Sequence, residues 1–495
     1  MKATAPGVSG GDIVGLRPEP ALETNNHRSE EPTPAEARLL RGWGRTAPTT
    51  AHVVAPRGPD EVAALLGVFD ARGQGAGPDG HTGRGGVIPR GLGRSYGDAA
   101  QCAGGTVVST EHLDRIGAIG SGGSVVVGAG VDLHRLICEV LPSGWFIPVS
   151  PGTRQVTVGG AIAADVHGKN HHRDGSFCQH VTSVTLATPT GVHLVGPHDD
   201  PTLFWATAGG LGLTGIVTEA IVQLLAVDTS WMVVDTERFD DLDGVMARMD
   251  QSDMSYRYSV AWLDCAARTS RRGRAVLTRG DHAPRAALPR GTEPVRLPRR
   301  PVLRVPVPAP RGLLNATTIA WFNELWFRRS PRNQSGELST IESYFYPLDF
   351  IADWNLLYGP LGFVQYQFVV GDAEALRATV DTIGASGVPS FLAVLKRFGA
   401  GNPGPLSFPM EGWTLALDFP IGPPGLPGLL RRLDDVVMEA GGRVYLAKDS
   451  RLSPDALHAM YPRLDELDSA RRRVDPEGVL RSDLSRRLQF AGGVR

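Results

Sequence analysis

Three glycine-rich segments in the first half of the chain combine small residues with hydrogen-bond donors. They are RGLGRSYGD at 90–98, PGTRQVTVGGAIA at 151–163 continuing into DVHGKNHH at 165–172, and AGGLGLTGI at 208–216. Glycine lets backbone N–H groups approach an anion closely, and the arginines and serine of the first segment add charge-assisted donors. That segment has GxGxxxG rather than GxGxxG spacing, and the sequence contains no GxxxxGK[ST] loop. Each segment alone is more often a structural turn, but together the three predict a long ligand that carries a pyrophosphate.

Lysine is rare in this chain. Among 50 lysines and arginines, only Lys2, Lys169, Lys396 and Lys448 are lysine. Because arginine supplies nearly every other cation, a lysine within a motif is expected to be needed for its compact ammonium group and its tunable pKa.

The composition limits the function classes. The chain has 495 residues, of which 42% are hydrophobic and 21% charged, enough for two or three folding units with large cores. Its net charge of −2 gives no overall attraction to nucleic acid. The four cysteines (102, 138, 178 and 265) form no CxxC pair, which argues against a disulfide framework, a zinc ribbon or an iron–sulfur cluster. No apolar run reaches the length of a membrane span and the N-terminus lacks a signal-like segment, so we expect a soluble, cytoplasmic protein.

The first half of the chain alternates between expected strands and helices. The β-branched runs at 181–188 and 216–224 predict strands, whereas Asp132 and the pair Asp200-Pro201 are expected to begin helices. Interleaved strands and helices indicate a mixed α+β domain over residues 42–227. The preceding residues 1–41 are rich in Pro, Gly and charge without an apolar period, and predict a disordered extension.

A second region begins near residue 228 and is expected to extend to residue 441. Its aromatic-rich runs predict an antiparallel sheet with two helices: strands at 343–346, 362–370 and 414–419, and helices at 372–384 and 426–440. Residues 279–311 carry eight arginines and many prolines, and predict a mobile basic loop. A solvated insertion and a docking loop for anionic lipid or phosphate are equally good interpretations of it.

The glycine-rich segments resemble the FAD-binding domain of the vanillyl-alcohol-oxidase/p-cresol-methylhydroxylase family of flavoproteins. The similarity extends to GWGRTAP at 42–48, FVQYQF at 363–368, PLSFPMEGW at 405–413, YLAKDSR at 445–451 and HAMYPRLDE at 458–466. HGKNHH together with LGRSYGD is highly specific. The resemblance implies a two-domain α+β fold: a PCMH-type FAD-binding domain at 42–227, a substrate-binding domain with an antiparallel sheet at 228–441, and a C-terminal return to the FAD-binding domain at 442–495.

The same resemblance implies a set of FAD-binding residues. Relatives often tether FAD through a histidine where Arg94 stands here, and arginine cannot form that 8α-histidyl bond, so FAD is expected to be noncovalent. Ile216 would lie near the adenine and Tyr445 near the isoalloxazine. The full implied set is Arg90, Gly91, Leu92, Gly93, Arg94, Ser95, Tyr96, Gly152, Thr153, Thr157, Val158, Gly159, Gly160, His167, Gly168, Lys169, Asn170, Ile216 and Tyr445.

The implied chemistry is alcohol oxidation, in which a hydride leaves the carbinol carbon for the flavin while a base takes the hydroxyl proton. Lys448, His167 and Tyr96 are the groups of the matching motifs that could relay that proton. Lys448 is the first choice for contacting the substrate, because burial would lower the pKa of its ammonium and its charge would hold a phosphate. A salt bridge to the neighbouring Asp449 is the alternative interpretation.

Further residues are expected around the substrate. Gln365 and Gln367 share one face of a strand, and in the family that face lines the active site, with Gln367 among the catalytic residues. Lys169 would lie beside the sugar pocket. Trp262 would form an apolar wall, although core packing would explain it equally well. Relatives carry GWNxCxD where this chain reads GWTLALD, so Thr414 and Ala416 replace an asparagine and a cysteine and leave a smaller pocket of altered polarity.

The histidines at 167, 171 and 172 invite a metal interpretation. The HxxxHH pattern has no carboxylate or thiolate at ligand spacing beyond Asp165, and a lysine stands at its centre, so no metal is expected.

Within the family, the resemblance implies oxidation of the 2′-hydroxyl of a polyprenyl-phosphoryl-β-D-ribose to the 2′-keto sugar. This is the first half of a two-protein 2′-epimerisation to the arabinose form in actinobacterial cell-wall arabinan biosynthesis. The expected partner is an NAD(P)H-dependent short-chain keto-sugar reductase, and the lipid substrate implies peripheral contact with the inner face of the membrane. Two alternatives remain open: an FAD-dependent oxidase or dehydrogenase of a soluble sugar, nucleoside or aminoglycoside in secondary metabolism, and a flavin-binding module without activity.

Overall fold

The computed structural model describes residues 36–69, 85–265, 273–298, 301 and 303–490. These belong to one compact unit, Thr33–Arg495, and the other unit, Met1–Pro32, lies outside the described residues. The predicted disordered extension at 1–41 also lies mostly outside the described residues. For residues 36–40 the prediction is wrong. Glu36–Leu40 forms strand β1, which pairs antiparallel with β2 (Thr49–Val54). Backbone pairing with a later strand orders these residues, and composition alone does not reveal such pairing.

The first glycine-rich segment begins where a parallel strand ends. A four-stranded sheet has the order β1-β2-β4-β3, in which β4 (Thr106–Ser109) runs parallel to both β2 and β3 (Val87–Arg90). The carboxyl end of a parallel strand is a common location for ligand-binding loops in α/β sheets. Strand β3 therefore delivers the RGLGRSYGD segment to such an edge.

A second, antiparallel sheet supports the other two glycine-rich segments. Its order is β5-β9-β7-β8, formed by β5 (Ser124–Gly128), β9 (Ile216–Gln223), β7 (Val181–Thr188) and β8 (Gly191–Val195), and a small pair joins β6 (Trp145–Phe146) to β10 (Leu225–Ala226). Its neighbouring helices are α1 (Pro59–Gly67), α2 (Leu133–Val140), α3 (Val158–Ala163), α4 (His171–Asp174) and α5 (Pro201–Thr207). The predicted caps are confirmed: Asp132 accepts a hydrogen bond from Arg135 N, and Asp200 accepts one from Leu203 N.

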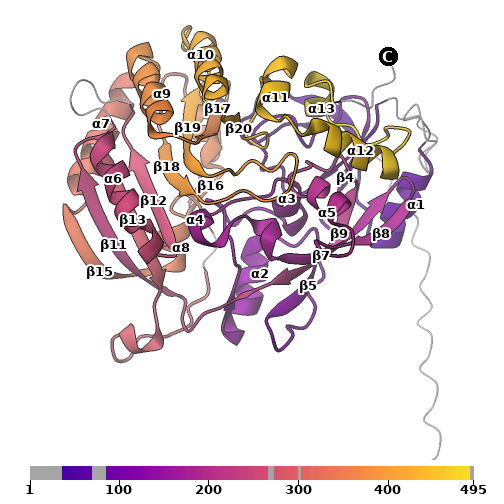
Figure 1. The fold of residues 1–495 in the computed structure, drawn as a ribbon, viewed down its shortest axis with the longest axis horizontal. Coiled ribbons are helices and arrows are strands. Elements are labelled where there is room, and N and C mark those ends of the chain that lie inside the picture. The colour runs from indigo at the N-terminus through magenta and orange to yellow at the C-terminus, as the bar shows by residue number, and fades with distance from the viewer. Residues whose placement is uncertain (1–35, 70–84, 266–272, 299–300, 302, 491–495) are drawn as a thin grey trace, which may run out of the picture. The chain divides into compact units, whose positions relative to one another are not determined.

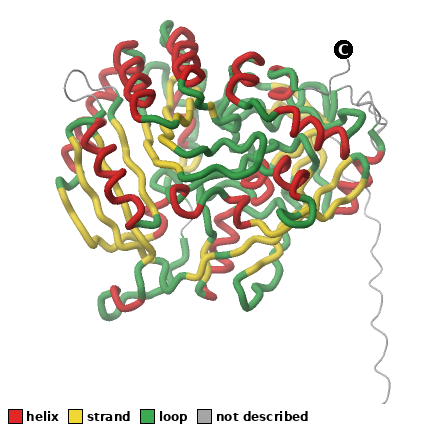
Figure 2. Tube along the Cα trace, viewed as in Figure 1, coloured by secondary structure: helices red, strands yellow, loops and turns green. Residues whose placement is uncertain are grey.

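The second region forms an eight-stranded antiparallel sheet (Figures 1 and 2). Its order is β15 (Asn333–Thr340), β11 (Trp231–Phe239), β13 (Ala275–His282), β12 (Tyr258–Leu263), β18 (Ala393–Phe398), β19 (Gly412–Pro420), β17 (Phe363–Val370) and β20 (Arg443–Val444). Helices α6 (Leu242–Ser252), α9 (Ala373–Ser386) and α10 (Leu426–Glu439) cover one face, and Figure 1 shows α9 and α10 over β17 and β19.

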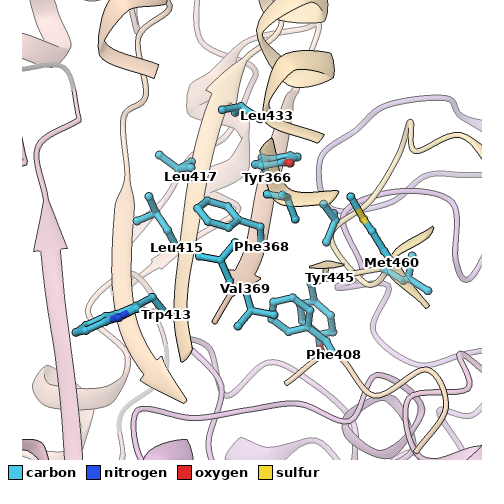
Figure 3. Close-up of a cluster of buried hydrophobic side chains, with 14 of the residues drawn as sticks. Tyr366, Phe368, Val369, Phe408, Trp413, Leu415, Leu417, Leu433, Tyr445 and Met460 are labelled. Atoms are coloured by element: carbon cyan, nitrogen blue, oxygen red, sulfur yellow. The ribbon is translucent and has the colours of Figure 1, made fainter. Parts of the chain in front are cut away.

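Side-chain alternation divides this sheet into an apolar face and a polar face. Figure 3 shows Phe368 of β17 and Leu415 and Leu417 of β19 in the cluster that packs beneath Leu433 of α10. The intervening residues of the same strands, among them Gln365 and Gln367, face away from these helices. The expectation that the two glutamines share one face is confirmed, because they occupy alternate positions of one regular strand.

Two expectations for the second region are wrong. The run predicted as a strand at 343–346 lies mostly in helix α8 (Ile341–Phe345), because the Thr340 side chain accepts a hydrogen bond from Ser343 N and caps a helical turn. The predicted basic loop at 279–311 begins later than expected, since residues 279–282 belong to β13 and buried Arg279 pairs with Glu237.

The rest of that loop contains short paired structure. After residues 299–300 and 302, which lie outside the described residues, β14 (Leu303–Arg304) pairs with β16 (Ile351–Ala352), and helix α7 (Ala316–Arg329) follows.

The C-terminal segment returns from the eight-stranded sheet to the first region. After β20, helices α11 (Pro454–Met460), α12 (Leu464–Val474) and α13 (Asp483–Arg487) follow, and α12 packs on α5. Val87 N donates to Val479 O at 2.9 Å, and Arg481 N donates to Val87 O at 3.0 Å, so this segment pairs with β3. No helix in the described part of the chain is long and apolar enough to cross a membrane.

Candidate active site

A cavity of about 280 Å³ lies between the glycine-rich segments and the polar face of the eight-stranded sheet. We name its two sides for what builds them. The loop wall consists of residues 91–96, 152–153 and 159–160. The sheet wall consists of Gln365, Gln367, Lys396, Ala416 and Lys448, the last from the segment that follows β20.

The loop wall is built by close approaches of backbone. A Cβ atom on Gly91 would lie 2.2 Å from Thr157 Oγ1, and one on Gly159 would lie 2.9 Å from the Ala129 Cβ. Thr157 is itself the N-cap of α3 and accepts a hydrogen bond from Gly160 N at 3.1 Å. Side chains at these glycines would collide with neighbouring loop residues, so glycine lets the loops pack closely together and leaves a smooth wall beside the cavity.

Arg94 supplies a cation to this wall. Its guanidinium carbon lies 3.8 Å from the centroid of the Trp43 ring, and its Nε is buried without a hydrogen-bond partner among the described residues. Burial lowers the pKa of Arg94, and the charges of Asp349 and Asp353 partly oppose that shift. A buried cationic donor that lines a cavity fits an anionic cofactor such as the pyrophosphate of FAD.

The sheet wall follows from strand register. Trp262 pairs with Val394, Val394 with Ala416, and Ala416 with Gln367, so these four residues form one row across β12, β18, β19 and β17. In the same way Lys396 of β18 lies opposite Thr414 of β19. Residues that are far apart in the sequence thus meet on one face of the sheet.

His167 connects the loop that follows α3 to the sheet wall. Its Nε2 lies 2.9 Å from Gln367 Nε2, and its Nδ1 lies 3.4 Å from Lys396 Nζ. Gln367 also donates to Thr414 Oγ1 at 3.2 Å. Burial, followed by the charge of Lys396, lowers the pKa of His167 well below its usual value. The imidazole is therefore neutral at neutral pH and links Gln367 to Lys396.

Two lysines of the sheet wall have lowered pKa values. Burial lowers the pKa of Lys396 to about 8. Burial also lowers the pKa of Lys448, whose Nζ lies 3.9 Å from the centroid of the Tyr96 ring, although the charge of Asp418 partly opposes that shift. Asp449 does not act as the partner of Lys448 in the salt bridge considered above, because its carboxylate pairs with Arg487 and accepts two backbone N–H groups.

Asp418 is a buried carboxyl on the same face of the sheet. It accepts hydrogen bonds from Gln365 Nε2 at 2.5 Å and from the Tyr358 hydroxyl at 2.9 Å, and burial raises its pKa. Burial and the charge of Asp418 also raise the pKa of the Tyr96 phenol well above its usual value. Tyr96 is therefore protonated at neutral pH.

Most of the residues predicted for the site line the cavity. Figure 3 shows one of them, Tyr445, beside Phe408; the two rings are stacked with centroids 4.6 Å apart. The predicted residues that line the cavity are Gly91, Leu92, Gly93, Arg94, Ser95, Tyr96, Gly152, Thr153, Thr157, Gly159, Gly160, His167, Gln365, Gln367, Ala416, Tyr445 and Lys448.

Eight predicted site residues do not line the cavity: Arg90, Val158, Gly168, Lys169, Asn170, Ile216, Trp262 and Thr414. The guanidinium of Arg90 is occupied by the carbonyl oxygens of Ala100 and Arg41. Ile216 is fully buried in the core, whereas Gly215 and Val217 on either side of it line the cavity. Strand alternation therefore points the Ile216 side chain away from the ligand space.

The centre of the HGKNHH motif supports the fold instead of lining the site. Lys169 donates to Tyr344 O and lies over the Tyr344 ring, while Asn170 donates to Pro148 O and to Asp174. A Cβ on Gly168 would lie 2.4 Å from Asn170 Oδ1, so glycine is needed there for packing.

The other three residues also have packing explanations. Val158 is buried in the hydrophobic core of the first region, and Thr414 is fully buried behind Gln367. Trp262 lies on the polar face of the sheet, next to Val394, but outside the residues that line the cavity.

Sequence reasoning missed two charged residues of the cavity, Lys396 and Asp349. The scarcity of lysine was a usable signal for Lys396, since Lys169, Lys396 and Lys448 all have strongly lowered pKa values in the folded chain. Asp349 accepts a hydrogen bond from Arg154 N at 2.9 Å, and no sequence pattern indicated it.

The three motif histidines do not converge on a point. His171 packs against Phe398 with ring centroids 4.4 Å apart, and His172 Nε2 lies near the carbonyl oxygens of Asp253 and Tyr256. In the described part of the chain, no three His, Cys, Asp or Glu residues are placed to hold a metal ion.

Comparisons with known proteins agree with this site. Residues 50–196 match the FAD binding domain family, and residues 428–488 match the D-arabinono-1,4-lactone oxidase family. A protein of Streptomyces coelicolor described only as an uncharacterised protein in the mprA 5′ region is 42% identical over 72% of this chain and all of its own length. Cytokinin dehydrogenase 8 of Oryza sativa subsp. indica is 29% identical over 43% of this chain and 41% of its own length.

The similarity is much more extensive for one relative of known activity. Decaprenylphosphoryl-β-D-ribose oxidase of Mycolicibacterium smegmatis is 44% identical over 465 residues, which cover 92% of this chain and 98% of that protein. The match to the FAD binding domain family covers every residue of the loop wall. FAD is therefore the cofactor of this chain. The chain belongs to the family of FAD-dependent oxidoreductases that includes decaprenylphosphoryl-β-D-ribose oxidase.

Proposed function

We propose that this chain oxidises the 2′-hydroxyl of a polyprenyl-phosphoryl-β-D-ribose to the 2′-keto sugar. The main support is the cavity itself, in which a glycine-rich loop wall faces a sheet wall that carries Gln367, Lys396 and Lys448, with His167 bonded between them. The near-complete alignment with decaprenylphosphoryl-β-D-ribose oxidase supports the choice of substrate.

The loop wall would hold FAD without a covalent bond. The cavity-lining glycines of the first loop would let the cofactor approach the backbone closely, and Arg94 would place a cation beside the pyrophosphate. Arginine forms no 8α-histidyl link, so denatured protein should release all of its flavin. When bound, FAD supplies a hydride acceptor for the carbon that loses its hydrogen.

Lys448 is suited to accept the hydroxyl proton. Its lowered pKa gives it a neutral fraction at neutral pH that an exposed lysine would lack, and its ammonium form can rest against the Tyr96 ring. His167 is neutral, and because its two ring nitrogens lie against Gln367 and Lys396 it would position these two side chains towards the sugar. With a pKa of about 8, Lys396 is mostly protonated at neutral pH and can bind the phosphate.

The keto product implies a second protein. Returning the 2′-carbon to the arabinose configuration needs a hydride from the opposite face of the sugar, which an NAD(P)H-dependent short-chain reductase would supply. The polyprenyl tail implies that the chain works at the surface of a membrane.

A soluble sugar, nucleoside or aminoglycoside is the second candidate substrate. It is favoured by Ala416, which lines the cavity and replaces the cysteine of relatives, and by Thr414 behind it, because both residues change the pocket beside Gln367.

Anaerobic bleaching of the bound flavin distinguishes the candidates. Bleaching by farnesylphosphoryl ribose within seconds, with the 2′-keto sugar identified by mass spectrometry, is the expected result. Bleaching by water-soluble sugars alone would replace the proposal with the second candidate, and a flavin that no alcohol reduces would leave only a binding role.

A further inference from the structure

Helix α7 (Ala316–Arg329) exposes large apolar side chains. Trp321 is 68% exposed, Trp326 46%, Leu325 41% and Phe322 36%. We call these four residues the α7 apolar face. The Phe322 and Trp326 rings are stacked nearly parallel, with centroids 6.4 Å apart. A soluble helix ordinarily turns such residues towards the protein core.

The opposite side of α7 is attached to the protein mainly by polar contacts. Asn323 is buried and donates to Asp264 at 2.8 Å, and Glu324 accepts from Arg274 at 2.6 Å. Arg238 donates to Phe327 O at 2.7 Å. These bonds fix the rotation of the helix about its axis, so the exposure of the apolar face is imposed by specific contacts on the other side.

Arginines lie at both ends of α7 in the sequence, with Arg311 before its Asn315 cap and Arg328 and Arg329 in its last turn. Arg328 and Arg304 are exposed but are paired with Glu324 and Asp353. Arg311 and Arg329 are also exposed, and among the described residues neither has an acidic partner within salt-bridge distance. Tryptophans bordered by arginines are the composition that binds the interface of an anionic bilayer.

A continuous series of aromatic rings joins this face to the cavity. Phe322 lies 5.1 Å from Phe391, Phe391 lies 6.2 Å from Tyr358, and Tyr358 stacks on Phe363 at 4.0 Å. Phe363 in turn lies 5.4 Å from Tyr96, which lines the cavity. Four ring-to-ring contacts therefore connect the apolar surface to the cavity through the protein.

We infer that the α7 apolar face and its arginines dock this chain on a bilayer that contains anionic lipid, next to the entrance through which a polyprenyl substrate reaches the cavity. The role of the entrance depends on the proposed function, whereas docking itself does not. A second copy of the chain is the competing occupant, but a surface with uncompensated Arg311 and Arg329 would bring like charges together in a symmetric dimer.

Vesicle flotation of the FAD-loaded full chain tests the docking. We expect the wild type to float with vesicles of phosphatidylcholine and phosphatidylglycerol in equal parts, and much less with phosphatidylcholine alone. Trp321→Ser/Trp326→Ser should lower the bound fraction at least about tenfold, because two interfacial side chains are removed. Leu194→Ser is the matched control, since Leu194 on β8 is 71% exposed and lies far from α7 in the chain. Flavin absorbance and the melting temperature confirm that each variant is folded.

The same variants separate failure of the docking from failure of the proposed function. Oxidation of short, water-soluble farnesylphosphoryl ribose should be unchanged in Trp321→Ser/Trp326→Ser, whereas oxidation of a long-chain substrate within vesicles should slow. If the wild-type chain floats with neither kind of vesicle, the docking is wrong, and the proposed function is unaffected. If the chain binds vesicles but oxidises neither ribose substrate, the docking stands and the proposed function is wrong. If the wild type forms a dimer that binds no vesicles, and the double substitution converts it to a monomer, then the α7 apolar face binds a second copy of the chain.

Discussion

The two walls of the cavity are built in different ways. The loop wall consists of short contiguous motifs in which glycine allows close backbone approach, as at Gly91 against Thr157. The sheet wall consists of side chains brought together by strand register, as with Gln367, Ala416 and Lys396. The first wall offers backbone and the Arg94 cation to a cofactor, and the second offers two buried lysines of lowered pKa. Binding and proton handling are therefore separable by substitution.

The largest effect is expected at the sheet wall. Lys448→Met should lower the rate of flavin reduction by about 10³-fold, because it removes the group best placed to take the hydroxyl proton. The FAD content of the variant should stay at the wild-type level, as measured by absorbance. Lys169→Met is the comparison variant: Lys169 is also a buried lysine of lowered pKa, but it donates to Tyr344 O and does not line the cavity. Equal losses in both variants would contradict the assignment.

A smaller effect is expected from Lys396 on stability. The pKa of Lys396 is about 8 in the folded chain against 10.5 for an ordinary lysine, so the unfolded state binds more protons between these values and stability rises with pH across that window. Below pH 8 the folded chain bears the full free-energy cost of burying the charged form of Lys396. Lys396→Met should therefore stabilise the chain at pH 7 by up to about 3 kcal/mol.

Urea unfolding midpoints of wild type and Lys396→Met, measured from pH 7 to above pH 10.5, check this expectation. The advantage of the variant should shrink through the window and vanish above it. A difference that does not change with pH would show that Lys396 is uncharged, or not buried, in the folded chain.

The smallest effect is expected at the loop wall. Gly91→Ala places a methyl group 2.2 Å from Thr157 Oγ1, and the resulting shift should weaken FAD binding by about ten- to thirtyfold. Turnover per bound FAD should be unchanged. Gly67→Ala is the control, because its Cβ would meet nothing within 4 Å. Titration of FAD into flavin-free protein gives the affinity. A loss of turnover in the fully loaded variant would mean that the two walls are not separable.

The difference between the walls also explains what the sequence could predict. The glycine-rich motifs are contiguous, so residues such as Arg94 and Gly159 could be assigned from short patterns. Lys396 and Asp418 reach the site through the pairing of β18, β19 and β17, which no local pattern encodes. Ile216 itself does not line the cavity, whereas its neighbours Gly215 and Val217 do, because a motif does not show which face of a strand each side chain occupies.

Helix prediction failed where capping competed with strand propensity. The aromatic run at 343–346 favours a strand by composition, yet the Thr340 cap starts α8 there.

Arg487 of α13 forms ion pairs with both Asp98, just beyond the loop wall, and Asp449, the neighbour of Lys448. The backbones meet at the same place, since a Cβ on Gly97 would lie 1.9 Å from Asp449 O. The last helix described thus holds the first glycine-rich loop against the segment that carries Lys448. During synthesis, the pocket is incomplete until α13 has left the ribosome, so flavin must enter after residue 487 is available for folding.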